Sequence, residues 1–140
     1  MKTIICAVDG SPGGVQALRV ASQMSDAFGL RLVLAHVAAG HRSIDGRPGG
    51  DKLGRQAAEH VLEQAAHAAG VGSDADRRAE AGERGSTLAR VAAEEAAAVL
   101  VLGSRTQGHA RRRRLLGSLA GELNATAPCP VLVVPPPARR

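Results

Sequence analysis

The chain has 140 residues and a formal charge of +5, and 44% of its residues are apolar. This length and apolar content suffice for one domain with its own hydrophobic core. It contains one Phe and neither Trp nor Tyr, so the core must be aliphatic. The missing aromatic residues argue against RNA-binding or single-strand-binding modules, which stack bases on aromatic rings. Four positive charges come from the run Arg111–Arg114, and a local patch suits a small anionic ligand at least as well as a nucleic acid. Nucleic acid is therefore not the expected partner.

The first part of the chain predicts a strand, a helix and a second strand. An apolar run over 3–8 stops at a turn in which Ser11 suits the N-cap and Pro12 suits the first helical position. The helix is expected to end near Gly29, and the next apolar run, 30–37, predicts the second strand. The residues expected on the buried side of this helix are Val15, Leu18, Ala21, Ser25 and Phe28.

The rest of the chain continues the alternation. Residues 39–50 are rich in glycine and predict a flexible loop, and the tail over 135–140 begins with three prolines. A helix is expected over 52–69, with Leu53, Ala57, Val61, Leu62 and Ala65 on its apolar face. The charged segment 73–81 predicts a strand at the edge of the sheet. The later elements are a helix from the N-cap Ser86 through Ala97, a strand over 99–102, a helix from Leu119 to about Thr126 and a strand over 129–134.

Five strands alternating with four helices predict a single α/β domain over 1–140, built on a doubly wound five-stranded parallel sheet with helices on both faces. Ligands of such sheets bind beyond the carboxyl ends of the strands, where the strand order reverses. For the order 3-2-1-4-5, this crevice lies between the first and fourth strands, where the loops 9–11 and 103–118 meet. The fourth strand would also separate Cys6 from Cys129, beyond disulfide reach.

The stretch from Val99 to Ser118 is the strongest candidate for a ligand site. Its apolar strand breaks at Gly103, a second glycine follows at Gly108, and Gly117 and Ser118 precede a helix whose first turn exposes unpaired N–H groups. Glycines that admit a ligand, a Ser at a helix start and concentrated positive charge are features of a phosphate cradle. The alternative interpretation is a long solvated connection with an arginine-covered surface.

Four parts of the chain match a known family in order and spacing. They are Ile-Cys-Ala-Val-Asp-Gly-Ser, Leu-Val-Leu-Ala-His-Val, Val-Leu-Gly-Ser-Arg followed by Leu-Leu-Gly-Ser, and Ala-Pro-Cys-Pro-Val-Leu-Val-Val. Over nearly its whole length the chain resembles the universal stress protein family. The resemblance implies the five-stranded fold described above, and one branch of the family binds ATP through the pattern G-x2-G-x9-G-[ST].

The glycine loop of this chain is a variant of that pattern. Gly103 matches its first glycine, and Gly117 with Ser118 match its closing pair. Thr106 stands at the second glycine, Gly108 lies two residues later, and the loop is one residue longer than the pattern. Because a threonine adopts positive φ only at a cost and its Cβ would crowd a phosphate, either Gly108 serves instead or phosphate binding is weaker.

The resemblance further implies that Asp9 and Val37 meet the adenine or ribose end of the nucleotide, with Ala7 and Val8 beside them. The alternatives are an Asp9 that only forms the turn before Gly10 and a Val37 that is an ordinary core residue. The complete set of candidate nucleotide-binding residues is Ala7, Val8, Asp9, Val37, Gly103, Ser104, Arg105, Gly108, Gly117, Ser118 and Leu119.

The predicted function is a nucleotide-binding stress-response module that senses or regulates. Its expected ligand is ATP, with or without Mg²⁺, and AMP and ADP are the alternatives. Neither a nucleophile–base pair nor metal-ligand spacing is found in the sequence, so no catalytic or metal residues are assigned and at most slow ATP hydrolysis is expected. The alternative function is a dimeric structural or interaction protein of the same fold with a weakened or empty site.

Two further expectations concern assembly and location. The uniformly apolar strand 131–134 at the sheet edge predicts a homodimer, and the resemblance points the same way. No signal peptide or run of transmembrane length is found in the sequence, so we expect a cytoplasmic protein without membrane contact.

Overall fold

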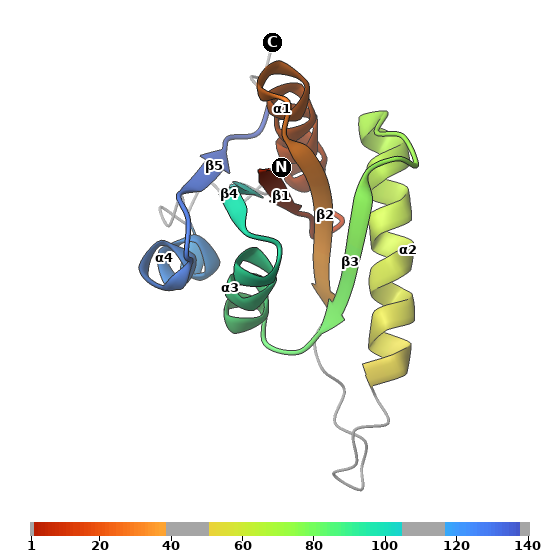
Figure 1. Ribbon diagram of the computed structural model, residues 1–140. Coiled ribbons are helices and arrows are strands. Elements are labelled where there is room, and N and C mark those ends of the chain that lie inside the picture. The colour runs from red at the N-terminus through yellow and green to blue at the C-terminus, as the bar shows by residue number, and fades with distance from the viewer. Residues whose placement is uncertain (1, 39–50, 105–116, 138–140) are drawn as a thin grey trace, which may run out of the picture.

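Helices and strands alternate along the chain as predicted. The computed structural model describes residues 2–38, 51–104 and 117–137. Within these ranges the elements are β1 (Thr3–Ala7), α1 (Pro12–Phe28), β2 (Arg31–Ala38), α2 (Asp51–Ala69), β3 (Asp76–Ala81), α3 (Arg84–Glu94), β4 (Ala97–Gly103), α4 (Gly117–Thr126) and β5 (Val131–Val134). The strands form one sheet in the order β3-β2-β1-β4-β5, and every pair is parallel (Figure 1). The predicted fold class and strand order are confirmed.

The start of α1 follows from local sequence. Ser11 is the N-cap, and its hydroxyl accepts a hydrogen bond of 3.2 Å from the backbone N–H of Gly14. Pro12 occupies the first helical position, where its missing N–H has no consequence. Gly29 ends the helix with a φ of 66°, a conformation that glycine adopts without steric cost. Both predicted ends of this helix are confirmed.

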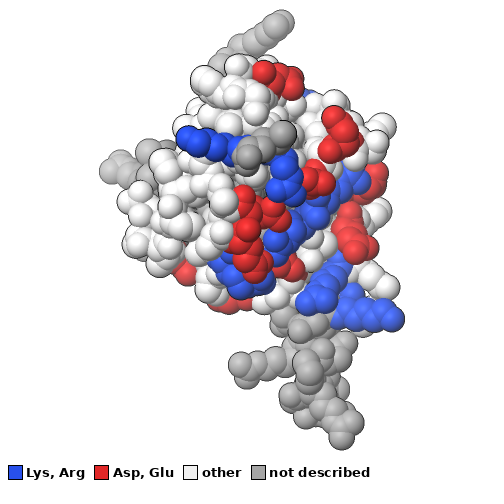
Figure 2. Space-filling view, in the orientation of Figure 1, with Lys and Arg blue, Asp and Glu red and all other residues white. Residues whose placement is uncertain are grey.

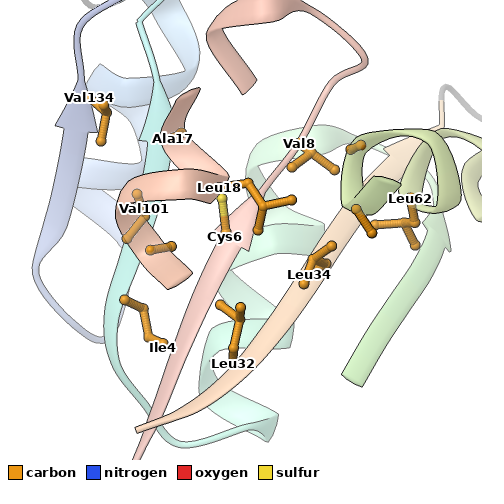
Figure 3. Close-up of a cluster of buried hydrophobic side chains, with 13 residues drawn as sticks. Ile4, Cys6, Val8, Ala17, Leu18, Leu32, Leu34, Leu62, Val101 and Val134 are labelled. Carbon is orange, nitrogen blue, oxygen red and sulfur yellow. The ribbon is translucent and has the colours of Figure 1, made fainter. Parts of the chain in front are cut away.

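Two hydrophobic cores flank the sheet, because alternate residues of a strand point to opposite faces. In β1, Ile4 and Cys6 pack in the core under α1 and α2, whereas Ile5 packs in the core under α3 and α4. Figure 3 shows the first of these cores, with side chains of both helices meeting those of the central strands. The buried apolar residues are Ile, Leu, Val, Ala and one Cys, as the composition predicts.

The buried faces of the first two helices differ from the prediction at the helix ends. Phe28 and Leu53 are each 69% exposed, where the pattern predicts inward positions. Both lie in terminal turns, outside the central turns that pack on the sheet. In α2 the buried stripe runs through Ala58 and Leu62, and Ala57 is exposed.

The helix α3 begins and ends earlier than the sequence predicts. Its N-cap is Glu83, whose carboxylate accepts hydrogen bonds from the backbone N–H groups of Gly85 (3.0 Å) and Ser86 (2.8 Å). The predicted cap, Ser86, lies inside the first turn and donates its hydroxyl to the same carboxylate at 2.6 Å. The helix ends at Glu94, and Ala96 takes a φ of 50° before β4 begins. Residues 96–98 are three consecutive alanines, and such a run shows neither the helical nor the strand alternation of apolar and polar residues. The predicted helix over 86–97 therefore continues past the observed end at Glu94.

The edge position of β3 is confirmed, although the strand is shorter than the predicted 73–81. Its charged side chains form ion pairs with β2, with α3 and with Glu95, the residue after α3. Figure 2 shows acidic and basic side chains interleaved on this face. This edge cluster joins Arg31 to Asp76 and Glu95, Arg78 to Glu80, Glu94 and Glu95, and Arg90 to Glu80 and Glu94. The guanidinium groups of Arg78 and Arg31 hold the pKa of Glu95 below its usual value.

The two cysteines are free, as predicted. Cys6 lies on β1 and Cys129 lies just before β5, so β4 separates their strands. Burial raises the pKa of the Cys6 thiol, and the negative charge of Asp9 raises it further. Burial also raises the pKa of Cys129.

Candidate functional site

A pocket opens at the carboxyl ends of β1, β2 and β4, the edge where a doubly wound sheet binds its ligands. The strand ends form its floor, and the first turns of α3 and α4 form walls. Its described lining residues are Ala7, Val8, Asp9, Gly14, Ala35, His36, Val37, Arg84, Leu88, Leu102, Gly103, Leu119 and Ala120. The enclosed space measures about 80 Å³, far below the roughly 300–1,000 Å³ of pockets that enclose a whole drug-sized ligand. The space that the described residues enclose thus fits one end of a nucleotide-sized ligand.

The structure brings six of the predicted site residues together in this pocket. They are Ala7, Val8, Asp9, Val37, Gly103 and Leu119. Gly117 and Ser118 begin α4, two residues ahead of the predicted helix start, and so directly precede the lining residue Leu119. Arg105 and Gly108 lie outside the described residues, as do the arginine run 111–114 and the loop 39–50. Whether any of these residues binds a ligand stays a prediction.

Asp9 is held by the turn between β1 and α1. Its Oδ1 accepts hydrogen bonds from the backbone N–H of Ser11 at 2.9 Å and from the Ser11 hydroxyl at 2.5 Å. The turn-forming interpretation of this aspartate is thus observed. Asp9 also lines the pocket, so the same turn that caps α1 fixes a carboxylate at the pocket wall.

Gly103 is required by packing. A Cβ at this position would lie 2.5 Å from the carbonyl oxygen of Gly13, 2.7 Å from its carbonyl carbon and 3.1 Å from the Gly14 nitrogen. A Cβ on Gly13 would in turn lie 3.1 Å from the carbonyl oxygen of Ser104. The start of α1 therefore crosses the end of β4 in backbone contact, which glycine permits. This contact brings the β1–α1 loop and the end of β4 together, as the predicted crevice requires.

Ser104 carries an unsatisfied polar atom next to this contact. Its backbone N–H donates to the carbonyl of Val134 at 2.8 Å, which ties the end of β4 to β5. Its hydroxyl Oγ is buried and has no hydrogen-bond partner among the described residues. A buried hydroxyl without a partner costs about 1–3 kcal/mol, but Ser104 is not among the described residues that line the pocket, so its predicted ligand contact stays a prediction.

His36 is tied to the turn that carries Asp9. Its Nδ1 lies 2.6 Å from the carbonyl oxygen of Val8. Since a carbonyl only accepts, Nδ1 carries the proton of this bond. The ring thus joins β2 to the end of β1, and its hydrogen bond satisfies a polar group at the pocket.

Seven lining residues were not predicted as site residues. They are Gly14, Ala35, His36, Arg84, Leu88, Leu102 and Ala120. Sequence reasoning considered the loops after the first and fourth strands and Val37 at the end of the second strand. Every β-to-α loop of a parallel sheet leaves at the same edge, so the loop between β3 and α3, which leads to Arg84 and Leu88, could have been included.

Comparisons with known proteins show the family and the fold of the chain. A model of the universal stress protein family matches residues 1–135. A curated Thermus aquaticus protein, described as a universal stress protein in the QAH/OAS sulfhydrylase 3' region, is 33% identical over 136 residues, which are 95% of this chain and 98% of that protein. A solved universal stress protein in complex with cAMP has a TM-score of 0.73 at 21% identity and covers 97% of this chain and 98% of its own. A family protein from Arabidopsis thaliana with AMP bound has a TM-score of 0.63 at 18% identity, with coverage of 99% and 94%.

The chain belongs to the universal stress protein family, as its sequence motifs predict. The solved structures share its fold of one five-stranded parallel sheet with helices. Among the helices in the described part of the chain, none is long and apolar enough to cross a bilayer.

Proposed function

We propose that this chain is a nucleotide-binding stress-response module that holds one end of an adenine nucleotide, ATP or AMP, in the pocket at the carboxyl edge of its sheet. The observation that carries the proposal is the convergence of Ala7, Asp9, Val37 and Gly103 from three strands on one pocket. Family members in complex with cAMP and with AMP support a nucleotide as the ligand class.

The base is the end that suits the enclosed space. Ala35, Val37, Leu88 and Leu102 offer the apolar surface on which a flat base packs, and the space is too small for the whole nucleotide. Asp9 accepts hydrogen bonds from ribose hydroxyls or from an amino group. These assignments keep the charged phosphates outside the apolar part of the pocket.

The phosphates then lie towards the start of α4. Backbone N–H groups at Gly117 and Ser118, in the first helical turn, are suited to an anion. This arrangement requires no lysine. ADP fits the same arrangement, and Mg²⁺ would enter with ATP through its phosphates, with no protein ligand assigned to it.

The proposed role is regulatory, so that nucleotide occupancy changes the shape or the partners of a cytoplasmic protein. The variant glycine loop, with Thr106 at the second glycine position and one extra residue, favours a second candidate function. That candidate is a dimeric interaction protein whose nucleotide site is weak or empty.

A binding experiment separates these two functions. Mass spectrometry of the purified protein tests for a retained nucleotide, and calorimetric titration with ATP and AMP measures affinity. We expect wild type to bind, and Gly117→Val to lose binding because its side chain would occupy phosphate space. Gly121→Val is the matched control in the same helix, since a Cβ at Gly121 meets nothing within 4 Å. Absence of binding by wild type would favour the interaction protein, and unchanged affinity in folded Gly117→Val would refute the backbone assignment.

We further propose that the chain forms a homodimer through β5. Among the described strands, β5 lies at the sheet edge and pairs with β4 alone, and Leu132 is its exposed large side chain. Prolines at 130 and 135 limit the ladder that a second copy could add to the residues between them. A strand pairing with its own copy across a two-fold axis closes the assembly at two chains.

The dimer is tested by light scattering at micromolar concentration. Leu132→Lys should yield a folded monomer, since this side chain faces solvent. Val133→Asp is the less informative variant because Val133 packs against the core under α3 and α4. A monomeric wild type would contradict the proposal.

A further inference from the structure

Two alanines lie side by side on the floor of the pocket. Ala7 on β1 and Ala35 on β2 are partners in the parallel register, and both line the pocket. Ala35 belongs to the core under α3 and α4, and Ala7 packs against that core, so both side chains point to this face of the sheet. Two residues earlier on each strand, the partners on the same face are Ile5 and Val33, which are fully buried. The side chains of the two central strands therefore become smaller where the pocket begins.

Larger side chains bound this pair of alanines on both sides. In the register of the sheet, β4 places Leu102 beside Ala7, and β3 places Arg78 beside Ala35. Leu102 lines the pocket, and Arg78 is held by ion pairs to acidic residues of the edge cluster. A strand that is buried in a parallel sheet usually carries Val, Ile or Leu, and alanine is depleted in strands. The two alanines thus leave a hollow in the middle of an otherwise bulky row.

The walls close over this hollow with apolar side chains. Leu88 from α3 and Ala120 from α4 are both buried, and both line the pocket. Ala35 itself is fully buried, so carbon atoms added to its side chain would enter the enclosed space of about 80 Å³. The volume that a ligand can use here is therefore set by the size of residue 35 and of its partner Ala7.

The proposed function determines which part of a nucleotide reaches the floor. With the ribose at Asp9 and the phosphates at the start of α4, the part of the base farthest from the ribose meets Ala7 and Ala35. A purine joins the ribose through its imidazole ring, and its second ring extends further from the sugar. A pyrimidine has no second ring. Because an apolar surface without a partner atom loses its dispersion contacts, a base that fills the hollow binds better than one that leaves it empty.

We infer that Ala35, together with Ala7, determines the base specificity of the pocket, because the two alanines leave the depth that the second ring of a purine occupies. This inference rests on the proposed function and adds to it Ala35, which lies outside the set of residues that the sequence predicts. It predicts that filling the hollow weakens purine nucleotides selectively.

The test compares AMP with CMP, which share the ribose and the phosphate and differ in the base. Calorimetric titration measures both affinities for wild type, Ala35→Val, Ala7→Val and the control Ala79→Val. Ala79 lies on β3, packs against the core under α1 and α2 and is not among the described lining residues of this pocket. One methylene in an apolar pocket is worth about 10- to 200-fold in discrimination.

Wild type should bind AMP more tightly than CMP. Ala35→Val should lose AMP affinity by a factor of about 10 to 200, whereas its CMP affinity should not fall, because the added carbon atoms occupy space that a pyrimidine leaves empty. Ala79→Val should keep the wild-type ratio of the two affinities. Circular dichroism and urea unfolding establish that each variant is folded. If Ala35→Val does not fold, Ala7→Val provides the same comparison at a half-buried position.

Three results would overturn the inference. The first is a wild type that binds CMP as tightly as AMP, and the second is an unchanged AMP affinity in folded Ala35→Val. The third is an equal loss of AMP and CMP affinity, which would indicate a general disturbance of the site. Failure of the proposed function is distinguishable, because wild type would then bind neither nucleotide.

Discussion

Replacing Gly103 with alanine tests whether the packing of the fold requires a glycine at this position in the absence of a ligand. The new Cβ would lie 2.5 Å and 2.7 Å from the carbonyl oxygen and carbon of Gly13. Both contacts are to backbone, so no side-chain rotation relieves them, and either the first turn of α1 or the end of β4 must shift. Overpacking of this kind costs about 1–3 kcal/mol. The lower entropy of the unfolded alanine chain offsets only about 0.4–1 kcal/mol.

Equilibrium unfolding in urea without nucleotide measures the effect. With a slope of about 1–3 kcal/mol per molar urea for small proteins, a net loss of about 1 kcal/mol lowers the urea midpoint by about 0.3–1 M. Gly121→Ala is the control in α4, where a Cβ meets nothing within 4 Å and alanine should stabilise the helix by up to about 1 kcal/mol. An unchanged midpoint in Gly103→Ala would refute the packing argument and leave a ligand as the reason for this glycine.

Three further predictions follow from contacts in and around the pocket. Gly14→Ala places a Cβ 2.9 Å from Oδ1 of Asp9, so this carboxylate must shift and AMP affinity measured by calorimetry should fall about tenfold. An AMP affinity equal to that of the control Gly121→Ala would contradict this prediction. In folded protein at pH 8, iodoacetamide should label Cys129 but not the buried Cys6, and in denaturant it should label both cysteines. Rapid labelling of both cysteines in folded protein would contradict the burial of Cys6. The pKa of Glu95 is held below its usual 4.5 by two guanidinium partners, so its contribution to the free energy of unfolding is complete above pH 4.5 and is lost as pH falls below it. Glu95→Gln should therefore be about 1 kcal/mol less stable than wild type at neutral pH, and the two stabilities should converge as pH falls through the lowered pKa of Glu95. Equal urea midpoints at neutral pH would contradict this prediction.

Short-range interactions made several features predictable from the sequence alone. The apolar runs identified the strands because a buried parallel strand needs apolar side chains on both faces. Ser11, Pro12 and Gly29 marked the ends of α1, since caps act within a few residues. The charges of β3 identified the sheet edge, and the glycine at the end of β4 identified one side of the pocket. Family membership followed from motifs whose order and spacing are properties of the sequence.

Only the tertiary structure decided the features that depend on packing between distant residues. Phe28 and Leu53 match the helical period but lie beyond the turns that pack on the sheet, and a period does not reveal where that contact stops. Gly103 fits a phosphate-binding pattern, yet its neighbour is the backbone of Gly13, which lies 90 positions earlier in the chain. Arg84 has no local signal of function, because it becomes a pocket residue only when the β3–α3 loop reaches the same sheet edge as β1 and β4. Local sequence encodes the elements and their ends, whereas the residues that share a pocket are set by the order in which the sheet assembles those elements.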